Sequence, residues 1–315
     1  MKKLRKMVAM GRTTFHAPLL LYVCLAVMVL LAGCHSAQIP KLLDTPRSAP
    51  GVAMQDVSFY SAALKRQMTY RVYLPAKIAP GQKLPVVYLL HGNGGSFQNW
   101  SNYSDVARYA APENSGGPIS NGLILVMVEG GQSYYVNSAS TPHDKYEDYL
   151  VTDLIGDVER RFPAATDRGS RAVVGVSMGA FAAVKLALTH PNLFSFTAGI
   201  SPAIDVPSRR FTFRRWDQSM RFRRIFGPVG SATRQAADPF LLARSANPTA
   251  TPYIYITAGE QEPLLEPIRR FAALLKRRGF SYEFHTKPGG HDWTEWDAQI
   301  PGCFDSLLRH LKQPG

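Results

Sequence analysis

The sequence predicts an α/β domain with a mostly parallel central sheet, an antiparallel N-terminal edge and helices on both faces. Short apolar runs rich in Val, Ile and Tyr alternate with longer stretches of helical periodicity, as buried parallel strands and their crossover helices do. Two segments before the first of these runs alternate apolar and polar residues, which is typical of an antiparallel pair. The length of 315 residues and the hydrophobic content of 45% suit one domain with a full-sized core.

The first 33 residues precede this domain and have the features of an export signal. Five basic residues and no acids lead into an uncharged apolar run at residues 17–32. The run ends in Leu-Ala-Gly-Cys, which resembles the cleavage box of bacterial lipoproteins. The resemblance implies a signal peptide over residues 1–33 and a lipid such as palmitate on Cys34. The alternative is an uncleaved membrane anchor, although a run of 16 residues that includes Pro18 is short for a span.

A lipidated Cys34 implies a protein attached to a membrane of the bacterial cell envelope, and His35 after it favours the outer membrane. Loss of the five basic residues of the signal lowers the formal net charge from +13 to +8. Residues 34–51 contain three prolines and little periodic apolar content, so we interpret them as a tether. The folded domain is expected over residues 52–315.

The elements of this domain follow from the pattern in chain order. The antiparallel pair is expected at residues 56–64 and 67–75. Buried strands are expected at residues 84–90, 122–128, 170–176, 194–200 and 252–258. Helical spacing of apolar residues predicts helices at residues 146–162, 263–279 and 303–311. Pro263 suits the first position of its helix and Gly279 the cap, while Cys303 is expected to be a small buried hydrophobic residue.

An arginine-rich insertion at about residues 204–250 interrupts the alternation of strands and helices. We interpret it as a helical excursion over the carboxyl edge of the sheet, where such folds bind ligands. Its segment Arg209–Arg224 holds seven arginines and one acid. One interpretation is a solvated helix with Phe213, Trp216 and Met220 packed underneath. The other is contact with phosphates of anionic lipid or with an acidic substrate. No nucleic-acid-binding motif accompanies the arginines, so no nucleic-acid partner is predicted.

Ser177 is the candidate nucleophile. It lies in Gly-Val-Ser-Met-Gly at 175–179, a G-x-S-x-G between a predicted strand and an alanine-rich helix. This context predicts a sharp turn that exposes the serine hydroxyl, with glycines where a side chain would collide. The N–H of Met178, at the start of the helix, is the first predicted donor to an oxyanion. The alternative for Ser177 is a helix cap.

A serine nucleophile needs a base, and His291 is the best candidate among eight histidines. It lies in Lys-Pro-Gly-Gly-His at 287–291, on a glycine-rich loop after the last strand-like segment, whereas the others lie outside the domain, in strand-like segments or at helix ends. The glycine-rich segment 91–95 follows the first central strand, and we assign the second oxyanion donor to the N–H of Asn93. A tight turn is the alternative role of these glycines.

Four segments together resemble the esterase D-type α/β-hydrolases, which include feruloyl esterases, S-formylglutathione hydrolases and secreted mycolyltransferases. They are residues 84–100, 146–162, 173–203 and 289–296. The resemblance implies an α/β-hydrolase fold, with the family's serine at Ser177 and its histidine at His291. The family's acid lies in a G-x-x-D, where this chain has Gly259, Glu260, Gln261 and Glu262. The resemblance therefore implies that Glu262 is the acid, with Glu260 as the alternative.

The predicted function is a serine esterase that works through an acyl-enzyme on Ser177. One alternative is an acyltransferase that passes the acyl group to an alcohol on a sugar or lipid, because both reactions use one triad. A second alternative is a noncatalytic envelope-binding protein on a hydrolase scaffold. No motif for a metal or a cofactor is present in the sequence, so neither is predicted.

Overall fold

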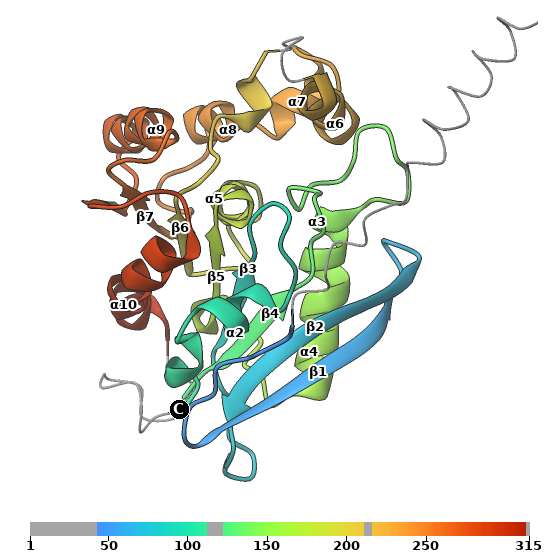
Figure 1. Ribbon diagram of the computed structural model, residues 1–315, viewed down its shortest axis with the longest axis vertical. Helices are drawn as coiled ribbons and strands as arrows, with labels where there is room; N and C mark the ends of the chain where they lie inside the picture. The colour runs from blue at the N-terminus through green and yellow to red at the C-terminus, as the bar shows by residue number, and fades with distance from the viewer. Residues whose placement is uncertain (1–42, 112–121, 211–215, 313–315) are drawn as a thin grey trace, which may run out of the picture. The chain divides into compact units, whose positions relative to one another are not determined.

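The predicted strands lie side by side in one sheet (Figure 1). The computed structural model describes residues 43–111, 122–210 and 216–312. Within these ranges the spatial order of the strands is β1 (Val52–Ser61), β2 (Arg66–Pro75), β4 (Ile124–Val128), β3 (Val86–Leu90), β5 (Arg171–Val176), β6 (Phe196–Ile200), β7 (Tyr253–Gly259) and β8 (Tyr282–Lys287). The β1–β2 and β2–β4 pairs are antiparallel, and the remaining neighbours are parallel. The predicted fold class is confirmed.

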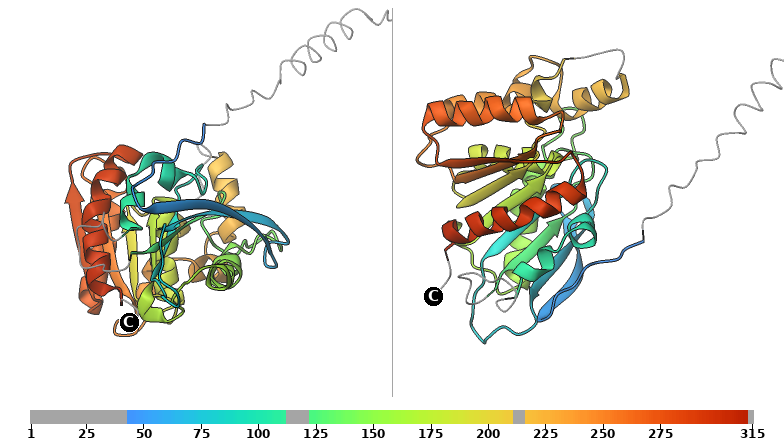
Figure 2. Two further views of the ribbon diagram at one scale, coloured as in Figure 1. Left: turned by 90° about the horizontal axis from the view of Figure 1, so that it is seen from below. Right: turned by 60° about the vertical axis from the view of Figure 1, so that its left-hand side comes forward.

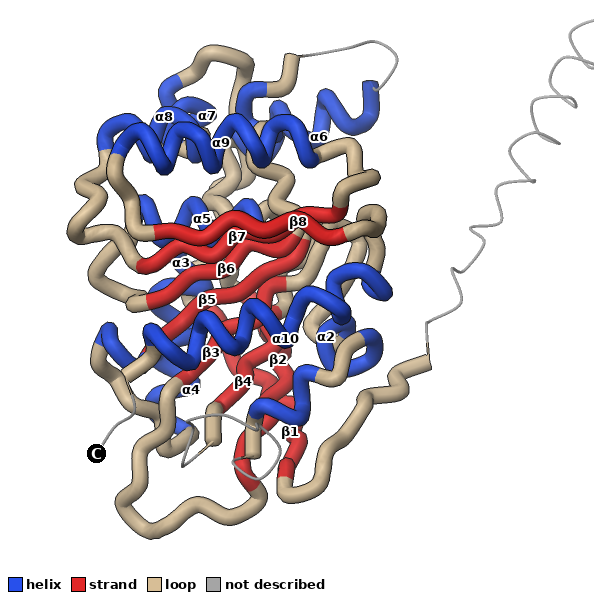
Figure 3. Tube along the Cα trace, turned by 90° about the vertical axis from the view of Figure 1, so that its left-hand side faces the viewer, coloured by secondary structure: helices blue, strands red, loops and turns tan. Residues whose placement is uncertain are grey.

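Helices cover both faces of the sheet (Figures 2 and 3). One face carries α2 (Asn99–Tyr103), the 3₁₀ turn η1 (Val106–Tyr109) and α10 (Trp293–His310). The opposite face carries α3 (Tyr146–Asp148), the π-helical turn η3 (Tyr149–Leu154), α4 (Ile155–Arg161), α5 (Met178–Thr189), α8 (Pro239–Ser245) and α9 (Leu265–Arg278). Two more 3₁₀ turns are η4 (Arg168–Ser170) and η5 (Val206–Ser208).

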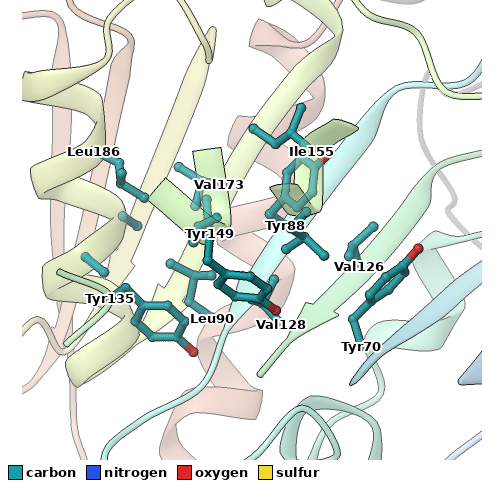
Figure 4. Close-up of a cluster of buried hydrophobic side chains, with 14 of the residues drawn as sticks. Tyr70, Tyr88, Leu90, Val126, Val128, Tyr135, Tyr149, Ile155, Val173 and Leu186 are labelled. Carbon is teal, nitrogen blue, oxygen red and sulfur yellow. The ribbon is translucent and has the colours of Figure 1, made fainter. Parts of the chain in front are cut away.

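Strand β3 shows why the sheet needs a layer of helices on each face. Val86, Tyr88 and Leu90 pack into the core beside α4 and α5, and Val87 and Leu89 pack into the core beside α2 and α10. Successive strand residues point to opposite faces, and all five side chains are fully buried. Figure 4 shows Tyr88 and Leu90 inside the first of these cores. Each such side chain contributes roughly 1.5–3 kcal/mol by its burial.

The predicted helices at 146–162 and 263–279 are confirmed, with one correction at the start of the second. Gly279 has φ +75° and ends α9, and its N–H donates to the carbonyls of Leu275 and Lys276. Helix α9 begins only at Leu265, so the expectation that Pro263 is its first residue is wrong. Residues 261–264 form a turn instead, so Glu262 lies outside the helix. Cys303 is buried in α10, as predicted.

The insertion is helical, as predicted, but its buried side is different from the expected one. Between β6 and β7 it contains α6 (Trp216–Phe226), α7 (Ala232–Ala236) and α8. Trp216 and Met220 are 55% and 42% exposed, so the prediction that they pack underneath α6 is wrong. Phe222, Ile225 and Phe226 form the buried side of the helix. Helical periodicity shows which residues share a face, but not which face meets the domain. Phe213 lies outside the described residues.

The compact unit begins at Asp44, within the segment expected to be a tether. Asp44 and Asp56 both bind the buried Arg71 guanidinium, with N–O distances of 2.6 and 2.7 Å. Arg47 pairs with Asp105 at 3.0 Å. These contacts attach residues 44–51 to the domain. The signal segment 1–33 and Cys34 lie outside the described residues, so their roles stay predictions. Among the helices of the described ranges, none combines the length and the apolar character that a membrane span requires.

A buried ion pair connects α3 to α5, and its loss should destabilise the fold. Both carboxylate oxygens of Glu147 lie 2.7 Å from Nζ of Lys185, and His190 Nε2 lies 2.9 Å from Oε1. Burial raises the pKa of Glu147, but the hydrogen bond from His190 and the Lys185 charge outweigh it and lower the pKa to about 2. We expect Glu147→Gln to lower the free energy of unfolding at pH 7 by ~3 kcal/mol or more, because Lys185 would remain buried without a carboxylate.

The pH dependence follows from the sign of that pKa shift. The stabilisation by Glu147 is present in full above its unfolded pKa of 4.5 and is lost as the pH falls towards about 2. In urea unfolding, the difference between wild type and Glu147→Gln should therefore shrink from pH 7 to pH 3. Asp144→Asn, which removes the exposed Arg66–Asp144 pair, is the control and should cost less than about 1 kcal/mol. Equal losses for both variants would contradict a special role for Glu147.

Candidate active site

Ser177 lies in a sharp turn between β5 and α5. Its backbone has φ +52° and ψ −108°, a conformation that non-glycine residues rarely adopt. Three hydrogen bonds stabilise the turn: the Ser177 N–H donates to the Ile200 carbonyl at 2.9 Å, and the Ser177 carbonyl accepts from the N–H groups of Phe181 (3.0 Å) and Ala203 (3.2 Å). The ends of β5 and β6 therefore fix the position of the serine.

The two glycines of the motif are required by close backbone contacts. A Cβ on Gly175 would lie 2.2 Å from the backbone of Gly179, and a Cβ on Gly179 would lie 2.3 Å from the carbonyl oxygen of Leu90. Neither contact can be relieved by moving a flexible side chain, because the colliding atoms belong to the backbone of β3 and α5. The glycines predicted from the motif thus allow α5 to approach the sheet directly behind Ser177.

The structure brings Ser177, His291 and Glu262 together in one hydrogen-bonded chain. The Ser177 Oγ lies 2.8 Å from His291 Nε2, and His291 Nδ1 lies 2.8 Å from Glu262 Oε2. In the neutral tautomer that fits these contacts, Nδ1–H donates to the carboxylate and Nε2 accepts the serine proton. The Glu262 side chain is fully buried, whereas that of His291 is 28% exposed. The base therefore faces the solvent-accessible side of the site and the acid lies behind it.

Glu260, the alternative acid, lies on the other side of the same loop. Its N–H donates to the Lys287 carbonyl at 2.8 Å, and its Oε1 accepts from Thr286 Oγ1 at 3.3 Å. The side chain is exposed, and among the described residues its hydrogen bond is with Thr286 and not with His291. The loop between β7 and α9 thus directs Glu262 towards the histidine and Glu260 towards β8.

The acid loop and the histidine loop are attached directly to each other. The Gln261 N–H donates to the Gly289 carbonyl at 2.9 Å, and the Gly289 N–H donates back to the Gln261 side chain. A Cβ on Gly259 would lie 2.5 Å from the Gly289 carbonyl oxygen, so the close approach requires glycine. The role of Gln261 was not predicted from the sequence. Its position between the two candidate acids was the indication of such a role in the sequence.

The predicted oxyanion donors lie beside the serine. Met178 is the first residue of α5, where an N–H has no partner within the helix. The loop after β3 turns at Gly94, which has φ +79°, and Asn93 and Ser177 line the same cavity. In the described ranges, the N–H of Asn93 donates to no protein acceptor. Both amides are therefore available to a bound group.

His91 anchors the Asn93 loop, a role that was not predicted from the sequence. The imidazole is fully buried; its Nδ1–H donates to the Gly92 carbonyl at 2.8 Å, and its Nε2 accepts from the Gly130 N–H at 3.0 Å. The backbone N–H of His91 donates to the Tyr135 hydroxyl at 3.0 Å. Its only local signal was its place directly before Gly92, because Gly130 and Tyr135 come from a distant part of the sequence.

A cavity of about 540 Å³ opens in front of the serine. Trp293 and Trp296 form an aromatic wall, with the Trp296 ring 5.1 Å from the His291 ring and 5.2 Å from the Trp293 ring, measured between centroids. Tyr134 and Arg209 line other parts of the cavity. The site therefore offers apolar surface for an acyl or alcohol group beside the polar reacting groups.

The comparisons with known proteins agree with this architecture. A family model described as putative esterase matches residues 61–306. The acetyl esterase of Caldicellulosiruptor saccharolyticus is 22% identical over 272 residues, which cover 82% of this chain and 99% of that protein. Solved structures share the fold as well. The S-formylglutathione hydrolase of Agrobacterium tumefaciens has a TM-score of 0.70 at 20% identity and covers 85% of this chain and 99% of its own. The fluorophosphonate-binding serine hydrolase F of Staphylococcus aureus has a TM-score of 0.68 at 22% identity. It covers 82% of this chain and 98% of its own.

The family match spans most of the chain and includes β5, the turn at Ser177, the Glu262 loop and His291. The fold class, the sheet order and this match agree. The protein belongs to the putative esterase family, and its general activity is the hydrolysis of carboxylic esters.

Proposed function

We propose that the protein is a serine esterase that forms an acyl-enzyme on Ser177. The observation that carries this proposal is the pair of 2.8 Å contacts that join Ser177 to His291 and His291 to Glu262. A serine hydroxyl is a weak nucleophile by itself, and a histidine within hydrogen-bond distance can accept its proton during attack. The order serine, acid, histidine along the chain is the one typical of the α/β-hydrolase fold.

In the acylation step, Ser177 Oγ bonds to the ester carbonyl carbon while its proton passes to His291 Nε2. The carbonyl oxygen becomes an oxyanion, for which the N–H groups of Met178 and Asn93 are the proposed donors. The bond from carbon to the alcohol oxygen then breaks, and His291 returns the proton to that oxygen. Glu262 accepts the Nδ1–H bond throughout and stabilises the imidazolium. Water attacks the acyl-enzyme by the same route and releases the acid.

Chemical labelling tests this proposal directly. A fluorophosphonate probe should add one label to each chain, on the peptide that contains Ser177, and the label should remove hydrolysis of 4-nitrophenyl esters in proportion. Added alcohols will show how the acyl group is divided between water and an acceptor. A protein that takes no label and hydrolyses no ester of any chain length would contradict the proposal and favour a noncatalytic binding role.

A further inference from the structure

A second cavity, of about 160 Å³, lies inside the arginine-rich insertion. Four arginines line it: Arg209 and Arg210 after η5, Arg223 on α6, and Arg234 on α7. The remaining lining residues are small or apolar, and none of them is acidic. The volume is about that of five water molecules at roughly 30 Å³ each in the liquid, enough for one carboxylate, phosphate or sulfate group with a few waters.

The positive charge around this cavity is mostly uncompensated. Arg209 pairs with Asp205, with Nη2 at 2.8 Å from Oδ1. Within the part of the chain that the structure describes, no carboxylate forms an ion pair with Arg210, Arg223 or Arg234. Among the four guanidinium groups, that of Arg209 alone forms an ion pair with a carboxylate of the described residues. An anion in the cavity would be attracted by these positive charges.

Arg234 is the most unusual of the four because its guanidinium is buried and bound only to neutral groups. Its Nε, Nη1 and Nη2 atoms donate to the carbonyls of Pro207 (2.6 Å), Gly227 (3.1 Å) and Arg209 (2.7 Å). Burial lowers the pKa of Arg234. A guanidinium has five N–H donors, so two remain after these three bonds. Arg234 both fixes the shape of the insertion and leaves donors for an anion.

The arginine cavity is a neighbour of the candidate active site. Arg209 lines both cavities. Phe222, which lines the arginine cavity, packs against Tyr134, which lines the active-site cavity, with ring centroids 5.7 Å apart. The two cavities therefore share part of their walls, at Arg209 and at the Phe222–Tyr134 contact.

We propose that the arginine cavity is a subsite for an anionic group, a carboxylate, phosphate or sulfate, that the ester substrate carries away from its reacting carbonyl. The proposal rests on the esterase function proposed above and assigns its substrate class. Guanidinium groups suit this task because their planar N–H forks match the oxygens of such anions. The anion would increase kcat/KM by binding, and mainly through KM, since the subsite does not touch the reacting atoms.

Two matched ester pairs test the proposal. For a charge on the acyl side, 4-nitrophenyl hexanoate is compared with 4-nitrophenyl hydrogen adipate, which has the same chain length. For a charge on the alcohol side, 4-acetoxybenzamide is compared with 4-acetoxybenzoate. We expect the wild-type enzyme to prefer the anionic member of at least one pair. Arg223→Glu should reduce kcat/KM for that member about tenfold or more, mostly through KM, and change the neutral member less than about twofold.

The matched control is Arg224→Glu. Arg224 is the next residue of α6, is also exposed, and lines a different cavity, so the same change in net charge leaves the arginine cavity intact. Both substitutions lie on the surface, and thermal unfolding will verify that both variants are folded. Arg224→Glu should keep the preference for the anionic ester. The proposal requires at least one ester pair for which wild type prefers the anionic member, Arg223→Glu loses this preference and Arg224→Glu retains it. If neither pair gives this result, the subsite proposal is wrong.

Three further outcomes separate this inference from its alternatives. Equal effects of both substitutions, seen only with esters presented in vesicles of anionic lipid, would overturn the subsite and favour contact of the insertion with a membrane surface. Hydrolysis of the neutral esters without any charge preference would overturn the subsite but leave the esterase proposal intact. Absence of hydrolysis with both members of both pairs would contradict the esterase proposal itself.

Discussion

Ser177→Ala is expected to lower kcat for ester hydrolysis by about 10⁴- to 10⁶-fold, the effect seen when the nucleophile of a serine hydrolase is removed. The Ser177 Oγ is the only atom of the chain within 2.8 Å of His291 Nε2 among the described contacts, so no other hydroxyl can take its place. The variant should still fold, since the elbow depends on backbone hydrogen bonds and on its two glycines. Initial rates with 4-nitrophenyl esters measure the loss.

Ser201→Ala is the matched control for this experiment. Ser201 follows β6, is fully buried, has φ +53°, and its hydroxyl has no hydrogen-bond partner in the described residues. The change removes the same atom from a similar strained backbone near the elbow, but it breaks no contact with His291. We expect kcat within about twofold of wild type. A loss in Ser201→Ala comparable to that in Ser177→Ala would mean that the first result reports disturbed folding.

Glu262→Gln is expected to lower kcat by about 10²- to 10⁴-fold, with little change in substrate binding. The glutamine can present an N–H₂ group to His291 Nδ1 in place of the carboxylate oxygen that lies 2.8 Å away. This favours the tautomer with the proton on Nε2, which cannot accept the serine proton. Full progress curves that yield kcat and KM separately will distinguish this effect from weaker binding.

Glu260→Gln is the control, because it changes the same functional group two residues away. Glu260 is exposed and its carboxylate contacts Thr286 rather than the histidine, so its loss should change kcat less than about threefold. If Glu260→Gln gave the large loss and Glu262→Gln the small one, the acid of the triad would be Glu260. A side-chain rearrangement during turnover would then be required.

The sequence was informative wherever a requirement is local. Gly175, Ser177 and Gly179 predict the elbow because a sharp turn against a buried strand leaves no room for a Cβ. A Cβ on either glycine would collide with the backbone for that reason. The alternation of apolar runs and helical stretches predicts the parallel sheet, since a strand covered on both faces needs apolar residues throughout. Gly279 ends its helix because its φ of +75° favours glycine.

The sequence was less informative wherever the answer depends on segments far apart in the chain. Spacing along α6 places Trp216 and Met220 on one face, but whether that face meets the core depends on where Tyr134 and Phe181 lie. Phe222 and Phe226 pack against those two residues instead, so the predicted packing of Trp216 and Met220 was wrong. The hydrogen bonds of His91 to Gly130 and Tyr135 could likewise not be predicted from the local sequence. The segment at His91 and the segment at residues 130–135 meet only in the folded protein.

The sequence by itself thus determined the fold class, the strand-to-helix turn at Ser177 and the candidate histidine, because steric constraint and periodicity act between near neighbours. Only the tertiary structure decided which glutamate contacts His291 and that four arginines from three segments line one cavity. Glu260 and Glu262 have the same side chain and lie two residues apart in the sequence. The direction of the backbone between β7 and α9, fixed by its hydrogen bonds to residues 287 and 289, sends one side chain to the histidine and the other away from it.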